Sequence, residues 1–175
     1  MFSEKTTTLL SYARKYKLAR KKVVLVKYQG DKRYNENKIM THNQDNHDVN
    51  YSLSRLGEIR DQVPDAEVIL IDEGQFFPDL AVISEYWAKA GKQVVISAVN
   101  GTFEQKPFVS ISEIIPHVNR IIHLSAVCTV CGNDAHFSIL KPHGKSGADM
   151  ERVEGAEFII GGADQYEARC RPCLP

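Results

Sequence analysis

Four short runs of apolar residues constrain the fold of this 175-residue chain more than any other feature. They lie at 23–26, 68–71, 94–99 and 121–124, and helix-like patterns separate them. A strand with one face in water alternates polar and apolar residues, whereas a continuous apolar run predicts a strand covered on both faces. Such strands occur in parallel sheets with helices on either side, so the sequence predicts an α/β fold.

Apolar residues with helical spacing lie between these runs. The stripe at 9–19 predicts a first helix, and the stripe at 80–90 predicts another that ends at Gly91. A weaker stripe at 53–63 predicts a further helix, although Gly57 interrupts it.

Two other stretches have no helical period. Residues 34–50 are polar and rich in asparagine, which indicates a long loop. From residue 125 onward, cysteine, glycine and mixed strand patterns replace the earlier alternation. We therefore expect two domains, at 1–124 and 125–175.

The opening residues match part of a phosphate-binding loop. Such a loop has the pattern G-x-x-x-x-G-K-[ST], in which glycines let backbone N–H groups wrap a phosphate. Lys5-Thr6 matches its end, but Glu4 occupies the second glycine position, and the first would lie before Met1. Because this loop normally follows a strand, we expect a sheet whose first strand is absent. Glu4 would need a backbone conformation that glycine reaches freely, and its carboxylate would repel phosphate.

Two carboxylates end the second apolar run. Asp72-Glu73 follows 68–71 directly, at the sheet edge where open α/β folds bind ligands. Phosphoryl transfer needs one carboxylate near Mg²⁺ and another to accept the proton of the attacking hydroxyl. The alternative is a solvated strand end, and these two residues alone leave both open.

Four cysteines form two closely spaced pairs, Cys128-x-x-Cys131 and Cys170-x-x-Cys173. Two pairs with this spacing can surround a zinc ion tetrahedrally, which predicts a zinc site; unrelated core or redox cysteines are the alternative. Four protein ligands leave no open coordination position, so the zinc would be structural.

The overall charge narrows the class of partner. Lys plus Arg and Asp plus Glu both number 22, which argues against a nucleic-acid or membrane surface as the main partner. No apolar run approaches the roughly 20 residues of a membrane span, and no signal peptide opens the chain. We therefore expect a cytoplasmic protein.

Five separated motifs resemble those of one family, the zinc-containing cytosolic type of thymidine kinase. They occur in the family's order between Met1 and Cys173, and chance agreement over this many motifs is negligible. They read DEGQFFPD at 72–79, NGTF at 100–103 with KPF at 106–108, and GGADQY at 161–166 before the second cysteine pair, together with Lys27-Tyr28, Asp31 and Arg33.

The resemblance implies both an architecture and an activity. It implies a RecA-like P-loop domain with a small zinc-bound lasso domain, assembled as a homotetramer. It also implies transfer of the γ-phosphate of ATP to the 5′-hydroxyl of thymidine, with Glu73 as general base. Thr6 and Asp72 would hold Mg²⁺, and the four cysteines would hold zinc.

The remaining site residues come from the same matching positions. The resemblance assigns contacts with ATP and its metal to Met1, Phe2, Ser3, Glu4, Lys5, Thr6, Asp31, Arg33, Asp72 and Gln75. It assigns contacts with thymidine to Phe76, Phe103, Phe108, Ser138, Ile159, Ile160, Gly161 and Tyr166. A planar pyrimidine gains from aromatic contact, and backbone amides can bind its edge.

The departures from the family pattern leave other functions open. Glu4 and the missing strand favour a catalytically impaired relative that binds nucleoside or pairs with an active domain. A zinc-ribbon interaction module without nucleotide chemistry is a third hypothesis, which the Asp72-Glu73 strand end and the aromatic residues disfavour.

Overall fold

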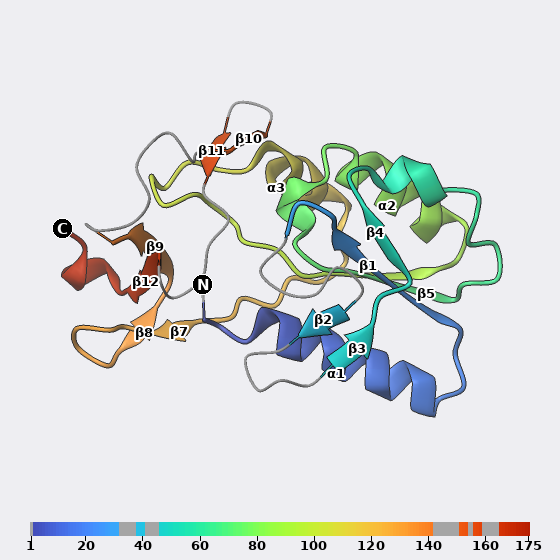
Figure 1. Ribbon diagram of the computed structural model, residues 1–175, viewed down its shortest axis with the longest axis horizontal. Coiled ribbons are helices and arrows are strands. Elements are labelled where there is room, and N and C mark those ends of the chain that lie inside the picture. Colours follow the sequence, from blue (N-terminus) through green and yellow to red (C-terminus); the bar gives the residue numbers. More distant parts are fainter. Residues whose placement is uncertain (1, 32–37, 41–45, 142–150, 154–155, 159–164) are drawn as a thin grey trace.

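The computed structural model describes residues 2–31, 38–40, 46–141, 151–153, 156–158 and 165–175. Its centre is a four-stranded sheet in the order β4-β1-β5-β6 (Figure 1). The strands are β1 at Val23–Tyr28, β4 at Tyr51–Leu53, β5 at Val68–Ile71 and β6 at Gln93–Ile96. All three pairings are parallel, so the strands end at one common edge. The predicted α/β fold with a parallel sheet is confirmed.

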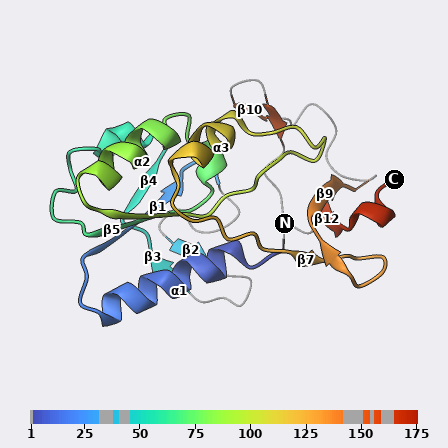
Figure 2. The same ribbon diagram turned by 180° about the vertical axis from the view of Figure 1, so that it is seen from behind.

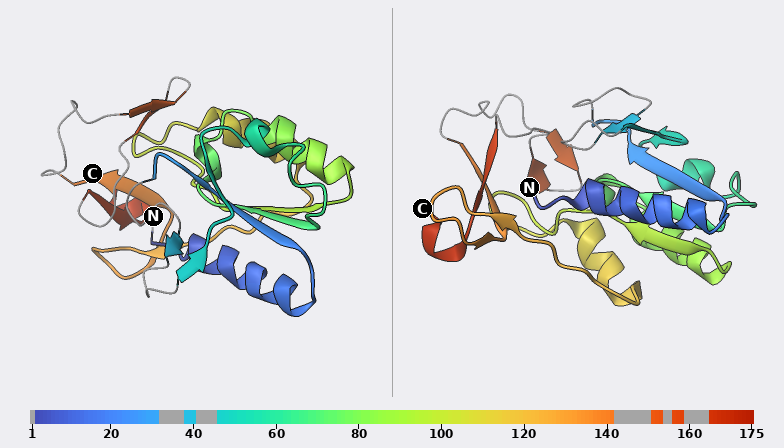
Figure 3. Two further views of the ribbon diagram at one scale, coloured as in Figure 1. Left: turned by 45° about the vertical axis from the view of Figure 1, so that its right-hand side comes forward. Right: turned by 90° about the horizontal axis from the view of Figure 1, so that it is seen from below.

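Helices cover both faces of this sheet (Figure 3). They are α1 at Lys5–Leu18, α2 at Leu80–Lys89 and α3 at Val109–Ile114. Along β5, Val68 and Leu70 pack on the side of α1, whereas Ile69 and Ile71 pack on the side of α2 and α3. Because successive strand side chains point to opposite faces, burial on both faces requires an all-apolar strand.

The predicted helices at 9–19 and 80–90 correspond to α1 and α2. Gly91 follows α2 with a φ of 81°, a left-handed angle that glycine adopts without strain. The short helix α3 has no clear sequence signal and was not predicted.

Two other predicted elements are wrong. The stripe at 53–63 forms only a 3₁₀ turn at Leu56–Ile59, where the Asp79 carboxylate accepts the N–H groups of Leu56 (3.1 Å) and Gly57 (2.8 Å). The run at 121–124 is not a strand, because none of the described strands pairs with it. Ile121 in this run is 63% exposed.

The predicted loop at 34–50 is corrected in part. Within it lies an antiparallel pair, β2 at Lys38–Met40 and β3 at Asn46–Asp48. The rest of that loop up to residue 45 lies outside the described residues. Polar composition predicted a loop here because short paired strands need no apolar run.

A smaller lobe with antiparallel strands follows the sheet in sequence and lies beside the start of α1 (Figure 2). Its pairs are β7 (Ala126–Val127) with β8 (Asp134–Ala135) and β9 (Phe137–Leu140) with β12 (Tyr166–Arg169), while β10 (Glu151–Val153) pairs with β11 (Ala156–Phe158). The lobe's small core consists of alanines and cysteines.

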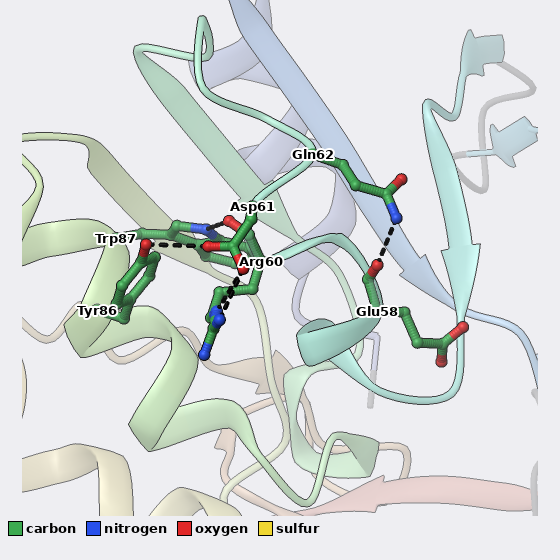
Figure 4. Close-up of polar contacts among 6 residues, drawn as sticks. All are labelled: Glu58, Arg60, Asp61, Gln62, Tyr86 and Trp87. Carbon is green, nitrogen blue, oxygen red and sulfur yellow. Dashed lines mark hydrogen bonds and ion pairs between the residues drawn. The ribbon is translucent and has the colours of Figure 1, made fainter.

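A polar cluster joins the segment after the 3₁₀ turn to α2 (Figure 4). The fully buried Trp87 donates its indole N–H to the carbonyl oxygen of Arg60 (3.0 Å). Tyr86 donates its hydroxyl to Asp61 (3.0 Å), whose carboxylate also binds the Arg60 guanidinium (2.7 Å).

Among the described residues, none of the helices has the length and apolar character that a membrane crossing requires.

Candidate functional site

The common edge of the sheet brings the start of α1 next to the end of β5. The hydroxyl of Thr6, in the first turn of α1, lies 3.3 and 3.5 Å from the two carboxylate oxygens of Asp72. These separations are longer than an ordinary O–H···O hydrogen bond, so the pair is held loosely. Oxygen atoms of this kind are the ligands that Mg²⁺ prefers, and the pair therefore fits that cation.

Asp72 is a buried acid in an environment that disfavours its charge. Only 6% of the residue is exposed. Burial raises the pKa of Asp72 to about 7, and the neighbouring carboxylate of Glu73 acts in the same direction. Lys5 opposes this shift, since its ammonium group favours the ionised form. A bound cation would favour the ionised form in the same way.

The turn after β5 has a constrained backbone. Glu73 adopts a φ of 54°, in the left-handed region that side-chain-bearing residues rarely occupy. At Gly74, an added Cβ atom would lie 2.6 Å from Cγ2 of Ile96, so the turn approaches β6 too closely for any side chain. The N–H of Gly74 donates to the carbonyl oxygen of Ser97 (2.9 Å). The turn thus holds Glu73 at the edge of the sheet beside Asp72.

Gln75 connects this turn to two other parts of the core. Its side-chain Nε2 donates to Glu73 (2.5 Å), and its Oε1 accepts the backbone N–H of Val99 (3.0 Å). The backbone carbonyl of Gln75 accepts the hydroxyl of Ser110, on α3 (2.9 Å). Both Gln75 and Ser110 are buried.

Three aromatic rings form a cluster beside the turn. The ring of Phe76 lies 5.1 Å from that of Tyr28 and 6.1 Å from that of Phe108, between centroids. Phe76 and Phe108 are buried, with Val99 and Ile111 packed against them. The family resemblance assigned Phe76 and Phe108 to the thymidine site, and the structure brings the two rings together.

A second aromatic pair joins the two lobes. Phe103, in the segment between β6 and α3, lies 6.3 Å from Tyr166, the first residue of β12. Both were expected to contact thymidine, and they meet at the boundary between the lobes. Ser138 lies on β9, where it pairs with Ala168 of β12, two residues after Tyr166 on that strand.

The segment before α1 has an unusual backbone for its residue types. Phe2 and Glu4 have φ values of 57° and 56°, so the left-handed conformation expected at Glu4 is confirmed. The side chain of Glu4 is exposed and makes no cap hydrogen bond to α1. Phe2 packs against the core of the smaller lobe, although it was expected to contact ATP.

The four cysteines converge at one point of the smaller lobe. The sulfur atoms of Cys128, Cys131, Cys170 and Cys173 all lie within 4.8 Å of one another, and none of the four is in a disulfide. Sulfur atoms this close fit the tetrahedral thiolate site expected for zinc.

The thiols of this cluster differ in acidity. Backbone N–H groups, first that of Cys170, lower the pKa of Cys128 to about 6. Hydrogen bonding with the Cys170 and Cys131 thiols raises the pKa of Cys173 to about 12. A divalent cation would remove this difference, because it stabilises every thiolate that it binds.

A chain of polar groups supports the cluster. Thr129, inside the first cysteine pair, donates to Glu167 (3.1 Å), which binds Arg169 (2.6 Å). Arg169 in turn donates to the carbonyl oxygen of Cys173 (3.1 Å). These bonds tie the two cysteine turns together from outside the sulfur cluster.

Several predicted site residues cannot be placed. Met1, Arg33, Ile159, Ile160 and Gly161 lie outside the described residues. Asp31 follows β1, and its charge adds to the raised pKa of Asp72. Ser3 lies between Phe2 and Glu4, next to α1.

Tyr28 and Ser110 belong to this site, although neither was predicted as a site residue. Tyr28 is the last residue of β1, and its signal in the sequence was the Lys27-Tyr28 motif shared with the family. Nothing in the sequence pattern distinguishes Ser110 from Ser112, the other serine of α3.

Comparison with known proteins gives consistent matches. A family model described as thymidine kinase matches residues 1–174. Thymidine kinase 1 of Dictyostelium discoideum is 40% identical over 177 residues, which cover 99% of this chain and 73% of that protein. The thymidine kinase of raccoon poxvirus is 41% identical over 173 residues, with 99% of this chain and 91% of that protein covered. That of vaccinia virus strain Western Reserve is 38% identical over 173 residues. None of these names favours the impaired relative.

Proposed function

The chain belongs to the thymidine kinase family, and from this membership we propose that it transfers the γ-phosphate of ATP to the 5′-hydroxyl of thymidine. The observation that carries the proposal is the meeting of Thr6, Asp72 and Glu73 at one edge of the sheet. An oxygen pair suited to Mg²⁺ thereby lies beside a second carboxylate, as phosphoryl transfer requires.

In this proposal each side of the site has a distinct task. Thr6 and Asp72 hold Mg²⁺, which neutralises negative charge on the phosphates when it is bound. Lys5, at the start of α1, attracts the phosphates, and the N-terminal end of the helix favours negative charge there.

Glu73 acts on the nucleoside. Its carboxylate accepts the proton of the 5′-hydroxyl as the oxygen attacks phosphorus, so that the P–O bond to the leaving ADP can break. The left-handed backbone at Glu73 and the close approach of Gly74 to β6 fix the position of the backbone from which this side chain extends.

The aromatic residues bind the base of the nucleoside. Phe76 and Phe108 supply an apolar wall from the core, and Phe103 with Tyr166 supplies a second wall that spans both lobes. Contact between these rings and a pyrimidine excludes water from the reacting groups. A structural zinc at the four cysteines holds the lobe that carries Tyr166.

We also propose a cytoplasmic location. Four cysteines that bind a metal and form no disulfide suit a reducing compartment such as the cytoplasm.

A homotetramer is proposed from the family resemblance, and light scattering on the purified protein would measure its mass. The domain division at 1–124 and 125–175 also remains a proposal.

Turnover of a carboxylate variant tests the proposed base. Labelled ATP, Mg²⁺ and thymidine are incubated with the protein and with Glu73→Gln. We expect transfer by the wild-type chain and a loss of kcat on the order of 100-fold or more in the variant. Glu113→Gln, which alters an exposed acid on α3, is the matched control and should keep full activity. Equal rates for Glu73→Gln and wild type would exclude Glu73 as the base.

A further inference from the structure

Gln75 has both ends of its side chain engaged inside the protein. Its Nε2 donates to Glu73 (2.5 Å), and its Oε1 accepts the N–H of Val99 (3.0 Å). Only 2% of Gln75 is exposed, so water does not replace these partners if they are lost. The amide plane therefore forms a rigid link between the turn after β5 and the segment after β6.

A third bond fixes the backbone of the same residue. The hydroxyl of Ser110 donates to the carbonyl oxygen of Gln75 at 2.9 Å, and Ser110 is also buried. Because Ser110 lies two residues after Phe108, on α3, this bond ties Gln75 to the helix whose start carries the aromatic wall. The link also has Val99, a member of that wall, at its other end.

We propose that Gln75 is a positioning residue. It orients the Glu73 carboxylate and ties it to the apolar wall formed by Phe76, Val99 and Phe108. The inference rests on the proposed phosphoryl transfer, for which Glu73 must meet the 5′-hydroxyl. Nucleoside contact with the wall is thereby coupled to the position of the base. The family resemblance led us to expect a contact of Gln75 with ATP or its metal, whereas the structure engages both ends of its buried side chain with Glu73 and Val99, so Gln75 touches neither reacting atom.

The coupling has a physical reason. Glu73 has a flexible side chain on a strained backbone, and a carboxylate oriented by one strong donor loses much of its rotational freedom. Misplacing a reacting group by about 1 Å can cost on the order of 100-fold in rate. Ordering the base before the nucleoside arrives avoids that loss.

Three variants separate the parts of the link. Gln75→Met keeps the length of the side chain and removes both polar ends. Gln75→Glu keeps an acceptor for Val99 but replaces the donor to Glu73 with a second carboxylate. Ser110→Ala removes only the hold on the backbone carbonyl. Ser112→Ala, on the same helix, is its matched control, because that hydroxyl bonds only to the carbonyl oxygen of Phe108 among the described contacts.

The kinetic arm measures kcat and KM for each variant. We expect Gln75→Met and Gln75→Glu to lower kcat on the order of 10- to 100-fold while KM for thymidine changes by less than about threefold. Ser110→Ala should lower kcat by a smaller factor, and Ser112→Ala should match the wild type. Melting temperatures establish that each variant is folded.

A double-variant cycle distinguishes positioning from a merely structural role. If Gln75 acts through Glu73, adding Gln75→Met to Glu73→Gln should lower kcat little further, because the group that it positions is already gone. If kcat falls by the same factor in both backgrounds, Gln75 acts independently of Glu73 and the proposal is overturned.

Hydrogen exchange tests the link without turnover. The Val99 amide should exchange faster in Gln75→Met, and it should stay protected in Gln75→Glu and Ser112→Ala. Unchanged exchange in Gln75→Met would overturn the link itself. If the wild-type chain transfers no phosphate, the proposed function fails and the catalytic part of this inference fails with it, whereas the exchange result still decides whether Gln75 holds Val99.

Discussion

Glu4 and Glu73 share a left-handed backbone, with φ values of 56° and 54°, on the two segments that meet at the site. A side chain in this region costs roughly 1–2 kcal/mol relative to ordinary angles. At Glu73 the strain accompanies a carboxylate that the proposed reaction uses. At Glu4 the proposed reaction has no use for a carboxylate, since the phosphates would lie near it.

Replacing Glu4 should therefore improve phosphate binding. We predict that Glu4→Gly lowers KM for ATP by about 3- to 10-fold, because it removes a negative charge whose repulsion is partly screened by water. It should also raise the free energy of unfolding by up to about 1 kcal/mol through relief of strain. Steady-state kinetics and urea unfolding measure the two effects.

Glu4→Gln separates charge from strain at the same position. It removes the charge but keeps a side chain in the left-handed conformation, so only KM for ATP should improve. A higher KM for ATP in Glu4→Gly would contradict this account of the loop.

At the residue scale the sequence predicted which residues belong to the site better than it predicted the contacts between them. The meeting of Thr6 with Asp72 followed from the order of loop and strand, since both end at one sheet edge. The bonds of Gln75 to Val99 and Ser110 did not, because Val99 lies in the segment after β6 and Ser110 on the unpredicted helix α3. No strand order or motif in the sequence indicates how those two segments pack against the turn.

Elements with strong periods were predicted, and those that depend on partners were not. The apolar run of β5 is buried on both faces, and α2 follows its stripe closely. The run at 121–124 has the composition of a strand but lacks a paired neighbour among the described strands. A strand needs ladder hydrogen bonds from another segment, and its own sequence does not supply them.

The attachment of α2 offers a test at the scale of elements. We predict that Trp87→Phe lowers the free energy of unfolding by roughly 1–3 kcal/mol, because it leaves a cavity and an unpaired carbonyl at Arg60. Tyr86→Phe, which removes an exposed bond to Asp61, should leave stability nearly unchanged. Chemical unfolding measures both, and equal losses in the two variants would contradict the assigned importance of the buried bond.

At the scale of the whole molecule, the contacts between the lobes that the described residues make include an aromatic pair and the packing of Phe2. Phe103 meets Tyr166 across the boundary, and Phe2 packs against the core that contains Cys128 and Cys170. The cysteine spacing predicted the metal site of the smaller lobe. It did not predict that the lobe would contact the segment before α1, because no pattern around Phe2 indicates a partner.

Removal of the metal should therefore affect nucleoside binding more than ATP binding. We predict one zinc per chain by elemental analysis. Its loss in Cys131→Ser should raise KM for thymidine by about 10-fold or more and KM for ATP by a smaller factor. The reason is that β12 carries Tyr166 and leads directly into Cys170 and Cys173. Equal KM values for thymidine with and without zinc would show that the smaller lobe does not contribute to nucleoside binding.

In the proposed reaction this chain moves a phosphoryl group from ATP to the 5′-hydroxyl of thymidine. Phosphorus NMR of the chain with ATP, Mg²⁺ and thymidine tests it directly, since the product is identified by its own signal. We predict that the γ-phosphate signal of ATP falls while a phosphomonoester signal, that of thymidine 5′-monophosphate, grows by the same amount. If no monoester signal grows, or if inorganic phosphate appears in its place, the chain does not transfer phosphate to thymidine.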